Sequence, residues 1–90
     1  MMRHATEMTL AKYPTLLASL RCVEGITEKR PGVFYWKSKA FLHFHEDPGG
    51  LYADLRCNAD EGLVRVRVHT KGEQSTFVRK VKMLTSCEHT

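Results

Sequence analysis

Apolar and polar residues follow two different periods along the chain, and the changes of period separate helices from strands. Between residues 9 and 22 apolar side chains recur at helical spacing, and Pro14 fits that helix if it lies in the first turn. Residues 64–69 alternate strictly, as a half-buried strand does. Residues 71–86 return to the helical period after Thr70 and Glu73, which have the spacing of a capping box.

Three further strands are predicted between these segments. Residues 33–37 and 40–46 are rich in β-branched and aromatic side chains, and residues 51–57 follow the turn signal Asp47-Pro48-Gly49-Gly50. Ninety residues suffice for one hydrophobic core. We therefore expect a single α+β domain over residues 1–90, a four-stranded antiparallel meander packed on N- and C-terminal helices.

The turn also predicts which side chains share a face of the sheet. If Glu46 pairs with Leu51, then His43 faces Asp54, and alternate residues point to opposite sides. The side expected to pack on the helices carries Leu42, Phe44, Leu51, Ala53, Leu55, Cys57, Val64, Val66 and Val68. The opposite side, here called the polar face, gathers His43, His45, Tyr52, Asp54, Arg56, Arg65, Arg67 and His69, with Phe34, Trp36 and Phe41 expected on the same side.

The polar face has an ordinary and a functional interpretation. Ordinary exposed sheet surfaces carry cross-strand charge pairs that stabilise by about 0.2–1 kcal/mol and need no ligand. Alternatively, His43 and His45 lie two residues apart on one strand, about 6.5–7 Å along it, so a metal could bridge them with Asp54 or His69 as third ligand. Because His-x-His lacks secure further ligands, no cofactor is predicted, and metal binding is the weaker alternative.

Charge and motif content favour a binding module over an enzyme. The chain has 14 basic and 10 acidic residues, a formal net charge of +4 and a pI near 9.2, so its surface favours anions. It contains no nucleophile elbow, phosphate-binding glycine loop or dinucleotide fingerprint. We expect the polar face to bind an anionic partner, either nucleic acid or a phosphorylated or acidic ligand. The alternative is a protein-interaction domain that forms a homodimer through exposed aromatics or an edge strand.

Cysteine usage and hydropathy predict the compartment. Cys22, Cys57 and Cys87 are odd in number and widely spaced, which fits reduced thiols better than a disulfide framework. No apolar run approaches the ~20 residues of a membrane span, and no signal-peptide stretch follows the first residues. We expect a cytoplasmic protein without a membrane partner.

Residues 23–28 and 33–42 also carry a family resemblance. They resemble the start of MmcQ/YjbR-like small bacterial proteins, in which a helix is followed by a "PGVTE"-like segment and a hairpin. Lys39 matches the family's hairpin lysine, whereas Ser38 replaces its glycine and residues 58–62 replace a longer insert with a further helix. The run from Phe41 to Asp47, with Asp54 after it, is also similar to the small bacterial luciferase-family domain. The first resemblance implies a fold and a suggested DNA-binding role, and brings no catalytic residue.

Overall fold

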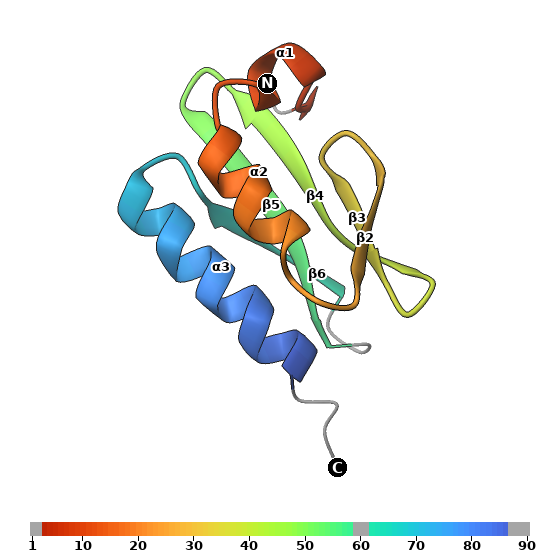
Figure 1. Cartoon of the computed structure of the whole chain (residues 1–90). Helices are drawn as coiled ribbons and strands as arrows, with labels where there is room; N and C mark the ends of the chain where they lie inside the picture. The colour runs from red at the N-terminus through yellow and green to blue at the C-terminus, as the bar shows by residue number, and fades with distance from the viewer. Residues whose placement is uncertain (1–2, 59–61, 87–90) are drawn as a thin grey trace.

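A computed structural model describes residues 3–58 and 62–86 of the chain (Figure 1). Its sheet runs in the order β2-β3-β4-β5-β6 with antiparallel neighbours, and β1 pairs with β4. The strands are β1 (Arg3–His4), β2 (Ile26–Arg30), β3 (Val33–Trp36), β4 (Lys39–Asp47), β5 (Gly50–Asn58) and β6 (Gly62–Arg67). The helices are α1 (Glu7–Leu10), α2 (Pro14–Arg21) and α3 (Lys71–Ser86).

The α+β class and the antiparallel meander are confirmed, but the predicted strand number is wrong. The sheet has six strands, because β1 and β2 join the four that the sequence pattern predicts. β2 is a mostly exposed edge strand whose residues, apart from Ile26, are polar, so it carries little hydrophobic signal. β1 has two residues, which is too short to show a period. The sequence also predicts a loop over residues 58–62, of which 59–61 lie outside the described residues, whereas Asn58 and Gly62 pair as the ends of β5 and β6.

The predicted register of the central hairpin is confirmed. Glu46 pairs with Leu51 and His43 with Asp54. In the connecting turn, the Gly49 N–H donates a 2.7 Å hydrogen bond to Asp47 Oδ1, which mimics a backbone turn. Gly50 follows with a φ of 136°, and a Cβ there would lie 2.9 Å from the His69 ring. Both the backbone conformation and the space at this position therefore require glycine.

Helices α2 and α3 lie side by side on one face of the sheet (Figure 1). Pro14 occupies the first turn of α2, where its missing N–H costs no helical hydrogen bond. The predicted capping box of α3 is formed, because Glu73 N–H donates to Thr70 Oγ1 at 3.2 Å and Thr70 N–H donates to Glu73 Oε1 at 2.9 Å. Among the described residues, no helix is long and apolar enough to cross a membrane.

The core lies between the helices and the sheet. Val66 is half-buried and Val64 is 37% exposed, because both lie on the edge strand β6. The predicted burial of these two valines is therefore only partly met. The buried hydrophobic residues are Leu10, Leu16, Leu17, Leu20, Val23, Phe34, Phe41, Leu42, Phe44, Leu51, Ala53, Leu55, Val68, Phe77 and Val81.

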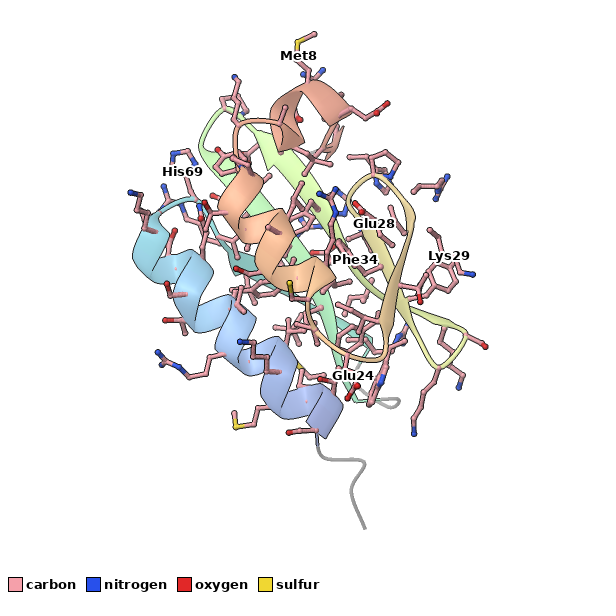
Figure 2. All side chains as sticks on the ribbon, in the orientation of Figure 1. Met8, Glu24, Glu28, Lys29, Phe34 and His69 are labelled. Atoms are coloured by element: carbon pink, nitrogen blue, oxygen red, sulfur yellow. The ribbon has the colours of Figure 1, made fainter. Side chains whose placement is uncertain are left out.

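The aromatics predicted on the polar face are placed differently. Phe34 pairs with Leu42 and points into the core (Figure 2). A bulge between the Phe34–Leu42 and Tyr35–Ala40 pairs adds one residue to β4, which turns Phe41 inward beside Leu42. Its ring contacts that of Trp36, with centroids 5.2 Å apart, and Trp36 is half-buried against the core. The predicted placement of these aromatics on the polar face is thus wrong, because the bulge reverses the side-chain alternation.

Truncating Phe44 should severely destabilise the fold. Its ring is 1% exposed and meets the Phe77 ring edge-on with centroids 6.3 Å apart. Phe44→Ala leaves a cavity there and should lower the free energy of unfolding by about 3–5 kcal/mol in urea titrations. Met8→Ala is the control, since Met8 is 80% exposed and its loss should change stability by less than about 0.5 kcal/mol. Similar effects of the two changes would contradict the assigned core.

Candidate functional site

Neighbouring strands bring four polar-face residues together. His43 on β4 pairs with Asp54 on β5, and Asp54 pairs in turn with Arg65 on β6. His45 lies two residues further along β4, and its ring centroid is 4.6 Å from that of His43. The confirmed hairpin register thus places both imidazoles, the carboxylate and the guanidinium on one side of the sheet.

Asp54 is a buried carboxylate held by an arginine. The residue is 7% exposed, and Arg65 donates from Nε to Oδ1 at 2.8 Å and from Nη2 to Oδ2 at 3.0 Å. These hydrogen bonds lower the pKa of Asp54 against the opposing effect of burial, and the nearby histidines lower it further. Asp54 therefore stays ionised at neutral pH and faces the two imidazoles as a fixed negative charge.

The imidazoles of His43 and His45 are enclosed but poorly satisfied. Asp54 Oδ2 lies 3.0 Å from His45 Nε2 and 3.9 Å from His43 Nε2, and the two histidine side chains are 12% and 18% exposed. The shorter contact is within ion-pair distance but does not have the geometry of a hydrogen bond. Among the described residues, no hydrogen bond reaches either ring nitrogen of His45 or Nδ1 of His43, and all three atoms are buried.

Burial also determines the protonation of His43. Desolvation lowers the pKa of His43, and the neighbouring charge of His45 lowers it further, against an opposing effect of Asp54. The His43 ring is consequently neutral at pH 7, which is the state in which an imidazole binds metal ions.

A third histidine, which the sequence interpretation missed, completes the group. β1 pairs His4 with His45, and the His4 ring centroid lies 4.8 Å from that of His45 and 5.5 Å from that of His43. One ring nitrogen from each of His4, His43 and His45 lies within 4.8 Å of the others, and we call these three residues the histidine cluster. His4 is exposed, and its two-residue strand offers no periodic signal that could have placed it here.

The other candidates on the polar face are occupied by local contacts. Arg67 Nη1 lies 3.0 Å and 3.1 Å from the two carboxylate oxygens of Glu73. Arg56 Nε donates to the Ala40 carbonyl at 3.1 Å. Tyr52 is half-buried between its pairing partners His45 and Arg67.

His69 does not lie on the polar face, so its predicted placement is wrong. β6 ends at Arg67, and the following Val68 is buried. The His69 N–H then donates to Glu73 Oε1 at 3.0 Å as the chain turns into α3. Its Nδ1 lies 3.2 Å from the Tyr13 hydroxyl just before α2, on the helix side of the sheet (Figure 2).

Comparison with known proteins gives no match for this chain. No family model matches it, and neither the curated proteins nor the solved structures contain a match. The resemblance to MmcQ/YjbR-like proteins and the predicted cytoplasmic location therefore stay predictions. Function has to be argued from the residues of the site themselves.

The buried imidazole should make stability depend on pH. Because the folded pKa of His43 is below its unfolded value of about 6.5, the unfolded chain binds more protons in the window below that pH. The free energy of unfolding should therefore fall as pH decreases from about 6.5 through the folded pKa. His43→Gln should flatten this part of the curve in urea titrations of metal-free protein. An unchanged slope would contradict the assigned burial of His43.

Proposed function

We propose that the protein binds a divalent transition-metal ion through His4, His43 and His45. The observation that carries this proposal is the convergence of three imidazoles whose ring nitrogens lie within 4.8 Å of one another. Two of these imidazoles also contribute the buried nitrogens without hydrogen-bond partners among the described residues. Imidazole is a preferred ligand of Zn²⁺, Cu²⁺, Ni²⁺ and Co²⁺, so the donor set selects this group of metals over Mg²⁺ or Ca²⁺.

The unsatisfied ring nitrogens of His43 and His45 make metal binding energetically favourable. A buried polar atom without a partner costs about 1–3 kcal/mol, and the pair His43 and His45 contains three such atoms. A bound cation would use one lone pair from each ring and would also offset the negative charge of Asp54. Metal binding thereby removes part of a cost that the folded chain otherwise carries.

Small side-chain movements would suffice to form the site. Tetrahedral coordination with metal–nitrogen distances of ~2.0–2.1 Å separates the ligand nitrogens by roughly 3.3 Å, so nitrogens within 4.8 Å of one another need to approach by at most about 1.5 Å. His4 can provide this movement because its side chain is exposed and its strand has only two residues. His43 and His45 are held in a long strand and form the rigid part of the site.

Asp54 supports the proposed site as a positioning residue. Both of its oxygens accept hydrogen bonds from Arg65, and Oδ2 also lies 3.0 Å from His45 Nε2. A carboxylate that accepts the N–H of a metal-binding imidazole fixes the orientation of the ring and increases its basicity, and a small rotation of the His45 ring would give the 3.0 Å contact this geometry. We therefore assign Asp54 to orienting His45, and the three imidazoles to binding the metal.

Three protein ligands leave a fourth coordination position for water or a small anion. Arg65, whose side chain is 49% exposed, contacts Asp54 next to the histidine cluster and would supply a positive charge to such an anion. A carboxylate or phosphate ligand would therefore fit this part of the polar face. Nucleic-acid binding across the whole polar face, and homodimer formation, stay predictions; the pairing of Arg65 and Arg67 with carboxylates lowers the charge available for the former.

Metal titration of tag-free protein tests the proposal. Isothermal calorimetry with Zn²⁺ should give one site per chain, and His45→Gln should weaken it by at least about 10–100-fold, because losing a ligand costs no less than losing a supporting contact. His4→Gln should weaken it less, since that ring is exposed and must move to bind. His69→Gln is the matched control, as His69 lies outside the histidine cluster, and it should leave the affinity unchanged.

Two outcomes would contradict the proposal. One is that the wild-type protein and the His45→Gln variant bind Zn²⁺, Ni²⁺ and Co²⁺ with the same affinity. The other is equal loss of affinity in the His45→Gln and His69→Gln variants, which would mean that scattered histidines bind the metal weakly. Circular dichroism of each variant shows whether it has kept its fold.

Bound metal should also stabilise the folded chain. If the unfolded chain does not bind the ion, Zn²⁺ at one hundred times its dissociation constant should raise the free energy of unfolding by ~2.7 kcal/mol. Thermal melts with and without Zn²⁺ measure this shift, and a chelator should reverse it. A melting temperature that is indifferent to Zn²⁺ at that concentration would contradict specific binding to the folded state.

A further inference from the structure

A groove of about 690 Å³ lies between α2 and α3 on the helix side of the sheet, away from the histidine cluster. Tyr13, Pro14 and Leu16 line it from the start of α2, and Val78 lines it from α3. Hydroxyl groups of Thr15, Ser19 and Ser75 add polar edges. The groove therefore combines an apolar floor with polar sides.

The charges along the groove have one sign. Lys12, Lys71, Arg79 and Lys82 line it, and no aspartate or glutamate does so. All four cations are exposed, and within residues 3–58 and 62–86 none of them forms an ion pair. Over the whole chain, positive and negative charges are more nearly equal in number, with 14 basic and 10 acidic residues. The charged residues that line the groove are therefore all positive.

Outside the groove, four arginines are paired with acids. Arg3 pairs with Glu46, Arg21 with Glu28, Arg65 with Asp54 and Arg67 with Glu73. The pair of Arg67 with Glu73 affects the charge of the groove, because it holds Glu73, an acid of α3, against Arg67 on the sheet. The cations of α3 that line the groove consequently have no acidic neighbour in it.

We propose that this groove binds an acidic segment of a partner protein, in which Asp or Glu residues are interspersed with apolar ones. Carboxylates would contact Lys71, Arg79 and Lys82 on one side and Lys12 on the other, while apolar side chains would cover the floor. Along α3, Lys71 and Lys82 are about 16 Å apart at ~1.5 Å per residue, which matches an extended segment of about five residues. The groove is open, as a site for a peptide chain must be.

The side chains that line the groove favour a peptide over a nucleic acid as the partner. Single-stranded nucleic acids bind where aromatic rings stack on successive bases. The groove offers two aromatic rings, those of Tyr13 and His69, and they already contact each other through the Tyr13 hydroxyl and His69 Nδ1. Aliphatic side chains such as Leu16 and Val78 instead suit the apolar residues of a peptide.

Fluorescence anisotropy with a labelled peptide of about eight alternating glutamates and leucines tests the proposal, since that length spans the groove in extended form. The wild-type chain should bind the peptide, with an affinity that falls as salt rises. Arg79→Glu with Lys82→Glu should weaken binding by about tenfold or more. Arg30→Glu with Lys39→Glu is the matched control, because both residues are exposed outside the groove and the change in formal charge is the same. This pair should weaken binding less than about threefold.

The proposal is independent of the metal site, so the two can fail separately. Absence of peptide binding at low salt would overturn it, as would equal losses from the two charge-reversed pairs. Tighter binding of an oligothymidylate of equal charge would also overturn it and point to nucleic acid. Circular dichroism of the two double variants checks that α3 is intact. Unchanged Zn²⁺ affinity of both variants would show that the histidine cluster is unaffected.

Discussion

The pairing of β4 with β5 determines which side chains of the sheet meet the helices and which face away from them. The turn at Pro48 and Gly49 fixes this register, and a slip of β4 by one residue would exchange the two faces of that strand relative to β5. Phe44 would then leave the core, and His43 and His45 would enter it. With the observed register, Phe44 and its apolar neighbours receive the helices, while the imidazoles and Asp54 gather on the opposite side.

Local chemistry in the sequence predicts most of the fold. The Asp47–Gly50 turn, the first-turn position of Pro14 and the Thr70–Glu73 capping box each act over a few residues, and each is present in the structure. What the sequence could not predict depends on distant contacts. β1 is held by pairing with β4 and by the ion pair of Arg3 with Glu46. The bulge that buries Phe41 changes the side-chain alternation from which Phe34, Trp36 and Phe41 were assigned to the polar face.

The residues of the candidate site likewise include some that local sequence patterns predict and some whose position depends on distant contacts. His43, His45, Asp54 and Arg65 follow from the hairpin register and the alternation of β6, so the sequence predicts them together. His4 arrives from the other end of the chain through a two-residue strand. His69 leaves the face because the capping contacts of Glu73 turn the backbone into α3. Ion pairing then separates two surfaces: the sheet face, where Arg65 and Arg67 are matched by acids, and the helix groove, where the cations are not.

Nitrogen NMR of the histidine rings during a Zn²⁺ titration would show whether His4, His43 and His45 act as one metal site, because each ring nitrogen reports its own coordination. We expect one ring nitrogen from each of these three residues to shift together and to saturate at one metal per chain, with the His69 ring unchanged. Shifts confined to His69, or spread equally over all the histidines without saturation at one equivalent, would contradict the account.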